Sequence, residues 1–199
     1  VLVQAACPVA FFLGDMAAAD RYVTMLVENS ERQALDFWQA YGHCFRAVLA
    51  IRRGAYVLSE RKGARGVILA TGSEVSIAMA AQELLDAREL PVRVVSVPSS
   101  TLFDRQDRAY RDAVLGTGLP RIGIEAGVTR WWGQYGCCAA LGVDSFGESA
   151  PAAQLCAHFG LSAEKLAELV QAQCDEEHRM VRASHSSTST RGPRPDQDR

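Results

Sequence analysis

The sequence predicts an α/β sandwich with a mostly parallel sheet. Between residues 52 and 174, short apolar runs alternate with longer segments whose apolar side chains recur at helical spacing, and glycine or proline marks the turns. Such alternation is typical of βαβ units. With 199 residues, of which 48% are hydrophobic and 22% charged, the chain has ordinary globular composition and room for one full domain with loose ends.

The first predicted unit is a strand, a helix and a second strand. Residues 66–71 form an apolar run that ends at a glycine, which indicates a buried strand entering a turn. Residues 74–88 follow as a helix, with Ser73 as its expected N-cap and Glu74 beside the positive helix end. Residues 91–97 then predict the next strand, which a proline closes.

The later elements continue this alternation, and a proline in the first turn opens one of the helices. In order they are a helix at 104–115 capped by Asp104 or Thr101, a strand at 121–125, a short helix at 131–135, a strand within 139–146, a helix that opens at 150–151 and a last helix that opens at Ser162.

The two flanks differ from this central zone. Residues 1–51 carry helical patches, but no motif in them defines a stable domain. Residues 184–199 are rich in serine, arginine, proline and aspartate and almost lack apolar side chains, so residues 175–199 are expected to form a disordered tail. That tail is either an interaction segment or a non-functional extension.

Charge and cysteine usage exclude several classes of protein. The net charge is −2, from 21 basic and 23 acidic residues, which predicts no nucleic-acid partner and no membrane-surface partner. The six cysteines show no C-x-x-C pair, and residues 1–14 lack the basic start of a secretory signal. We therefore expect reduced, mostly buried thiols in a cytoplasmic protein.

One candidate binding site is the turn between the first predicted strand and its helix. Thr71, Gly72 and Ser73 present backbone N–H groups at a helix start, an arrangement that suits an anion. The P-loop and dinucleotide glycine patterns are both missing, so the alternative is a simple helix cap.

Other candidates lie at the ligand-facing edge of the expected sheet or form an interface. Glu125 ends a strand and is either an acid/base group or a partner of Arg130 or a backbone N–H. Trp131 and Trp132 belong to an aromatic cluster that is either an interface or core, and Glu148 lies near a helix start. The four histidines are scattered, so no catalytic, cofactor-binding or metal-binding residue is assigned.

Several blocks of the sequence together resemble one family. Residues 53–58, 68–75, 93–99, 103–115 and 146–151 resemble, in the same order, blocks of the C-terminal domain of transketolase, a thiamine diphosphate-dependent enzyme. The resemblance is collinear over residues 52–173 and implies a domain at 52–174. It also implies a three-layer α/β/α sandwich with a mixed, mostly parallel sheet of about five strands.

The resemblance also implies a function for the complete enzyme, which transfers a two-carbon ketol unit between sugar phosphates in the pentose phosphate pathway. Family members use thiamine diphosphate and magnesium, held by two preceding domains across a dimer interface. The motifs of those domains are missing here, so we expect no cofactor on this chain and no activity in isolation. The expected partners are the transketolase catalytic domains or a second subunit, in a homo-oligomer.

Two alternatives remain open. The chain is either a non-catalytic binding or assembly module, or a relict gene fragment in which one intact domain survives. The second alternative rests on the loss of similarity on both sides of the central zone, which suggests a truncated or rearranged gene product.

Overall fold

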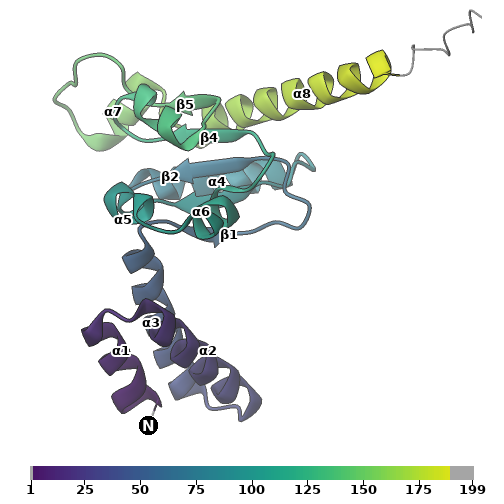
Figure 1. Ribbon diagram of the computed structural model, residues 1–199. Coiled ribbons are helices and arrows are strands. Elements are labelled where there is room, and N and C mark those ends of the chain that lie inside the picture. Colours follow the sequence, from purple (N-terminus) through teal and green to yellow (C-terminus); the bar gives the residue numbers. More distant parts are fainter. Residues whose placement is uncertain (1, 189–199) are drawn as a thin grey trace, which may run out of the picture. The chain divides into compact units, whose positions relative to one another are not determined.

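The computed structural model describes residues 2–188, and they form two compact units. Of the described residues, the first unit contains 2–56 and 97–111, and the second contains 57–96 and 112–188. The elements, labelled in Figure 1, are η1 (Leu2–Ala6), α1 (Cys7–Leu13), α2 (Met16–Arg32), α3 (Asp36–Arg53), β1 (Tyr56–Ser59), β2 (Val67–Ala70), α4 (Glu74–Asp86), β3 (Arg93–Ser96), α5 (Ser100–Asp104), α6 (Arg108–Leu115), β4 (Arg121–Ile124), η2 (Thr129–Tyr135), β5 (Ala139–Leu141), α7 (Ala152–Phe159) and α8 (Ala163–Thr188).

In the first unit, the N-terminal segment, for which the sequence predicted no stable domain, forms packed helices. In α2, Ala19, Val23 and Leu26 recur at helical spacing and are buried with Leu49 of α3. Asp15 caps α2 by accepting a hydrogen bond from the backbone N–H of Ala18 at 2.8 Å. The apolar face of α2 therefore has a partner, which its own sequence could not identify.

A five-stranded sheet forms the centre of the second unit, and its strands lie in the order β1-β3-β2-β4-β5. The pairs β2–β3, β2–β4 and β4–β5 are parallel. The predicted mixed, mostly parallel sheet of an α/β domain is thereby confirmed. The hydrophobic pattern did not predict β1, because its four residues are only partly buried and do not form a fully apolar run.

Helices cover both faces of this sheet. Ile68 and Ile122 point into a core shared with Leu85 of α4 and Leu166 of α8. On the other face, Gly123 lies against the ring of Trp132, a residue of η2 that is almost completely buried. Successive strand residues face opposite sides, so the fully buried run of β2 supplies both cores.

The predicted helix at 104–115 is two helices in the structure. Ser99 caps α5, because its Oγ accepts from the N–H of Leu102, and Asp107 starts α6 by accepting from the N–H of Tyr110 at 2.8 Å. The expected caps, Asp104 and Thr101, lie inside α5 instead. The Asp107 carboxylate, which lies in the middle of the predicted helix, therefore separates α5 from α6.

The last helix runs further than the sequence suggested. The expected domain boundary at 174 falls inside α8, which continues to Thr188. Up to residue 180, where the description of burial ends, the last buried residue is Cys174, and strong helix formers such as Glu176, Glu177 and Arg179 carry the helix on, exposed to solvent. The rest of the expected tail, 189–199, lies outside the described residues.

The strand expected within 139–146 is short, because β5 ends at Leu141. Phe146 lies in the loop that follows, with 97% of its surface exposed. Among the residues that the structure describes, no helix is long and apolar enough to cross a membrane.

Candidate functional site

The strand order places a crevice at the carboxyl ends of β2 and β4. From β2 the chain passes through α4 to β3 on one side, whereas from β4 it passes through η2 to β5 on the other. In open α/β sheets, ligands bind where neighbouring connections diverge in this way.

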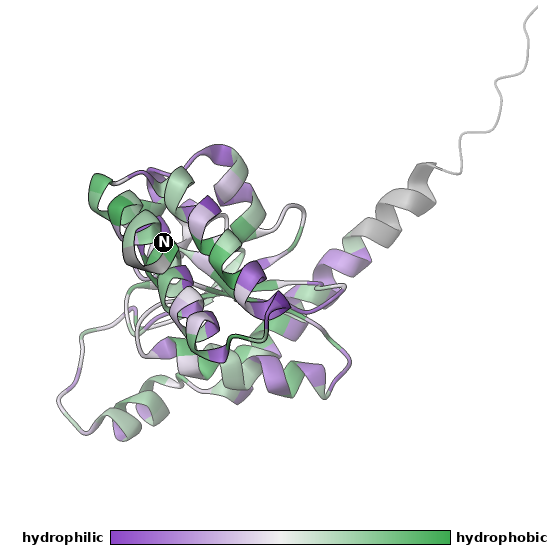
Figure 2. Cartoon of the chain, turned by 90° about the horizontal axis from the view of Figure 1, so that it is seen from below, coloured by the Kyte–Doolittle hydropathy of each residue, from purple (hydrophilic) through white to green (hydrophobic). Residues whose placement is uncertain are grey.

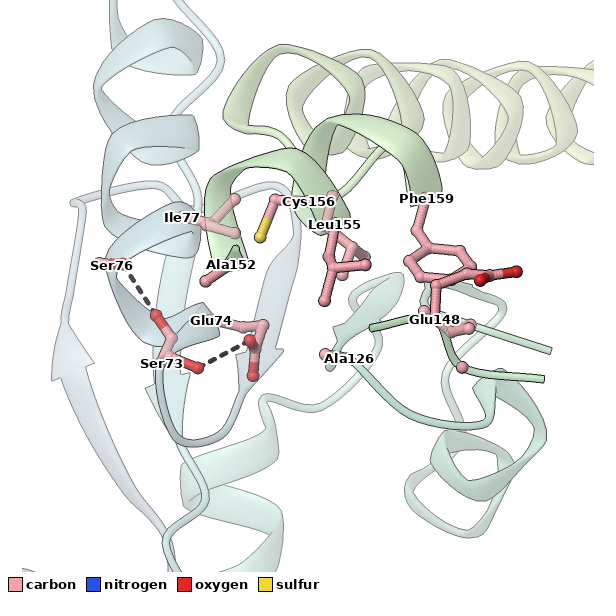
Figure 3. Close-up of a pocket in the computed structure, with 13 residues that line it drawn as sticks. Ser73, Glu74, Ser76, Ile77, Ala126, Glu148, Ala152, Leu155, Cys156 and Phe159 are labelled. Atoms are coloured by element: carbon pink, nitrogen blue, oxygen red, sulfur yellow. Dashed lines mark hydrogen bonds between the residues drawn. The ribbon is translucent and has the colours of Figure 1, made fainter. Parts of the chain in front are cut away.

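A cavity of about 490 Å³ occupies this position (Figure 3). Its lining comes from the start of α4, the loops after β4 and β5, and α7 with its flanking turns. The lining residues are Ser73, Glu74, Ser76, Ile77, Ala126, Val143, Gly147, Glu148, Ala152, Leu155, Cys156, Phe159 and Leu161. Most of this surface is apolar, a composition typical of small-molecule pockets.

The predicted anion-binding turn, Thr71 to Ser73, lies at the edge of this cavity, and only Ser73 lines it. The Ser73 hydroxyl donates to the carboxylate of Glu74 at 2.8 Å, and Glu74 has only 8% of its surface exposed. Ser73 Oγ therefore does not accept from the helix N–H groups as a cap would. A carboxylate already lies at the positive end of α4.

Glu125 lies next to this carboxylate across the β2–β4 boundary. Burial raises the pKa of Glu125 above its ordinary value, and the negative charge of Glu74 raises it further. Ala126, the next residue, lines the cavity. The structure thus brings together two carboxylates that are distant in sequence, and repulsion between them favours the protonated form of Glu125.

Replacing Glu125 by Gln should stabilise the fold at pH 7 but not at pH 4. The folded-state pKa of Glu125 is raised, so the folded protein holds its proton more tightly than the unfolded chain does, and stability falls as the pH rises through the folded pKa. The gain is at most about 1 kcal/mol, since the side chain is half-buried. Urea unfolding of both proteins at the two pH values measures it.

The exposed Glu83, on α4, offers a control, since Glu83→Gln should change the free energy of unfolding only slightly. A carbon-detected NMR titration in which the Glu125 carboxyl titrates at or below its ordinary value would contradict this prediction.

The loops at the rim of the cavity are tied together by Asp144. Its carboxylate accepts from the backbone N–H of Thr129 at 2.8 Å and from the Thr129 hydroxyl at 2.7 Å, and these two bonds lower the pKa of Asp144. Gly142 leaves room for the same approach, because a Cβ there would lie 2.5 Å from the Gly127 carbonyl oxygen. The loops after β4 and β5 are therefore held as one rim.

The aromatic candidates divide between core and surface. Trp132 and Tyr135 are buried within this chain, as core residues are. Trp131 keeps 37% of its surface exposed and packs edge-on against Trp132 with ring centroids 4.8 Å apart. Arg130 and Trp132 line a separate cavity of about 340 Å³ beside η2.

The cysteines are less buried than the sequence suggested. Only Cys7 and Cys174 are buried, whereas Cys44 and Cys138 are exposed. Burial raises the pKa of Cys137 to about 12 and that of Cys174 to about 11, so neither thiol is activated as a nucleophile. Within residues 2–188, no three His, Cys, Asp or Glu side chains gather as metal ligands do.

Of the predicted site residues, Ser73 and Glu148 line the main cavity, while Thr71, Gly72 and Glu125 lie beside it. Sequence reasoning missed Ile77, Leu155 and Phe159, which form the apolar part of the lining. Their spacing resembled that of ordinary core positions. Knowledge of the strand order would have placed the segments after β2 and β4 together.

Comparison with known proteins agrees with the resemblance seen in the sequence. The family model described as "Transketolase-like TK C-terminal domain" matches residues 54–162. The plasmid-encoded transketolase of Cupriavidus necator is 56% identical over 117 residues, covering 56% of this chain and 17% of the relative. Transketolase 1 of Pasteurella multocida is 46% identical over 129 residues, covering 61% of this chain and 19% of the relative.

Solved structures show the same relation. The transketolase from Leishmania mexicana superposes with a TM-score of 0.61 at 40% identity, covering 64% of this chain and 19% of that one. The matched part of the chain thus spans less than a fifth of these relatives, each of which is named as a transketolase.

Proposed function

Because the chain belongs to the family of transketolase-like C-terminal domains, we propose that it serves as the C-terminal domain of a transketolase. It acts in two-carbon ketol transfer between sugar phosphates, in the cytoplasm and in the pentose phosphate pathway, only together with domains that bind thiamine diphosphate and magnesium. Those catalytic domains belong to a partner chain or to a second subunit in a homo-oligomer.

The acidic and apolar lining of the cavity supports the proposal that other domains bind the cofactor. The described residues that line it include Glu74 and Glu148 but no lysine or arginine, so a diphosphate would meet two carboxylates without a compensating cation. The lining also lacks a set of oxygen ligands suited to magnesium, since Glu74 Oε1 already accepts from Ser73. The lining of this cavity therefore does not fit the cofactor of the family.

A complementation assay tests the proposal. The plasmid-encoded transketolase of C. necator, truncated before the segment that this chain matches, is mixed with the full chain, and ketol transfer is measured with thiamine diphosphate and magnesium present. We expect the mixture to regain activity, because the chain supplies the missing domain. The chain alone should neither turn over substrate nor bind thiamine diphosphate in a titration.

Two glycine variants calibrate this assay. Gly133→Ala should complement normally, because no atom lies within 4 Å of the added Cβ, whereas Gly123→Ala should fail, because its Cβ would overlap Trp132. Turnover by the isolated chain, or failure of the chain to pull down the truncated enzyme, would overturn the proposal.

An exposed aromatic cluster favours a second candidate function, a self-assembling module. On α3, Phe37 has 64% of its surface exposed, and its ring centroid lies 5.1 Å from that of Trp38 and 5.2 Å from that of Tyr41. Exposed apolar side chains grouped in this way are typical of interfaces, here with a second copy of the chain. Sedimentation of the wild type and of Phe37→Ser tests this: a dimer lost in the variant supports it, and a monomeric wild type excludes it.

A further inference from the structure

The cavity at the ends of β2 and β4 has a property that ketol transfer does not explain. It is large enough for a small molecule, at about 490 Å³, and within the range of ligand pockets. Its middle is apolar: Leu155 and Cys156 project from α7 toward Ile77 of α4 (Figure 3). An occupant therefore needs an apolar body.

The charged groups of the cavity all have one sign. Glu74 and Glu148 lie on opposite sides of the apolar middle (Figure 3), and Phe159 belongs to the same lining. The described lining residues include no basic side chain to neutralise these carboxylates. Glu125, just outside the lining, adds a third carboxyl group, whose pKa is raised by burial first and by the charge of Glu74 second.

This charge pattern selects the occupant. A phosphate or carboxylate would face repulsion from both acidic side chains, and a neutral molecule would leave their charges uncompensated. A positively charged nitrogen is attracted by the carboxylates and also by the face of an aromatic ring such as that of Phe159.

We propose that the cavity between α4, α7 and the carboxyl ends of β2 and β4 binds a small organic cation, a protonated amine carried on an apolar body. The amine lies at the exposed Glu148, the charge of Glu74 attracts it from across the cavity, and the apolar body lies against Ile77, Leu155 and Phe159. This site is separate from any thiamine diphosphate chemistry, and it does not depend on the proposed function.

The packing of α7 provides an entry route. None of the residues of α7 is buried, and the loop before it, which carries Glu148, is exposed. A ligand can therefore reach the cavity by displacing α7 slightly, without opening the core between α4 and α8.

The experiment compares three probes of similar shape on the full chain by two-dimensional amide NMR. They are 2-phenylethylamine, which is cationic, 2-phenylethanol, which is neutral, and 3-phenylpropanoate, which is anionic. We expect the amine to shift the amide signals of residues 73–77 and 152–161 and to bind about tenfold more tightly than the alcohol. The anion should bind more weakly than either.

Variants locate the binding site. Ala152→Trp fills the cavity from an exposed position and should abolish the amine-induced shifts. Glu74→Gln and Glu148→Gln should each weaken amine binding about fivefold while leaving the affinity for the alcohol unchanged. Glu83→Gln, an exposed acidic position on the same α4 helix, should have no effect.

The outcomes separate the proposal from its alternatives. Equal binding of the three probes, or shifts that survive Ala152→Trp, would overturn it. Glu74 is buried, so circular dichroism checks whether Glu74→Gln folds. If it does not fold, Glu148→Gln alone decides, and an unchanged amine affinity in that variant refutes the proposal.

Discussion

Gly123→Ala should lower the free energy of unfolding by about 3 kcal/mol, which makes it one of the most damaging single changes in the chain. A Cβ built on Gly123 would lie 2.5 Å from Cδ2 and 2.7 Å from Cδ1 of Trp132. Neither side can yield easily, because Gly123 pairs with Leu69 and Ala140 in neighbouring strands and Trp132 is almost completely buried. Urea unfolding followed by tryptophan fluorescence measures the loss.

A matched glycine and a compensating change sharpen this prediction. Gly133→Ala, in the same region but with open space around its Cβ, should change stability by less than about 0.5 kcal/mol. Adding Trp132→Leu to Gly123→Ala should recover part of the loss, because the smaller side chain makes room. If Gly123→Ala is as stable as the wild type, the packing of Trp132 on β4 is not as described.

Arg121→Met should cost about 3 kcal/mol, for a different reason. The Arg121 guanidinium donates to the carbonyl oxygens of Leu115 at 3.0 Å, Gly116 at 2.7 Å and Tyr135 at 2.9 Å. One cation thereby satisfies the backbone at the end of α6 and at the end of η2. Methionine keeps much of the volume but none of the donors.

Arg121→Lys should fall between the wild type and Arg121→Met, since a single ammonium group cannot reach three carbonyls in that geometry. Arg88→Met removes an exposed arginine that donates to the side chain of Gln171, and it should cost less than about 0.5 kcal/mol. Hydrogen exchange should speed up at residues 115–118 and 135–138 in Arg121→Met. Unchanged exchange there would show that the guanidinium does not hold these turns.

The fold class followed from local patterns, because buried parallel strands are short apolar runs and their helices show one apolar face. Residues 67–70 and the helix from Glu74 are the clearest cases, and both lie where predicted. The predicted ends were wrong where a local side-chain acceptor begins a helix, as at Asp107, and where good helix formers extend α8 beyond Cys174. The first kind of helix end depends on a single hydrogen bond, and the second depends on helix propensity in a segment that packs against nothing described.

The candidate site followed from sequence only in part. Ser73 and Glu148 were named from their turns, and both line the cavity. The sequence could not predict that Glu74 and Glu125 lie close together, because fifty residues separate them. They meet only because β2 and β4 are neighbours in the sheet. The same limit applied to Trp132, whose aromatic character suits a core and an interface equally.

By itself the sequence determined the α/β class, the family and most of the helices and strands, since these depend on residue patterns within short segments. Only the tertiary structure decided which strands are neighbours, where an acidic, apolar cavity opens and which tryptophan is buried. Those properties arise from contacts between residues far apart in the chain. The physical reason is that periodicity specifies which face of an element is buried but not what buries it.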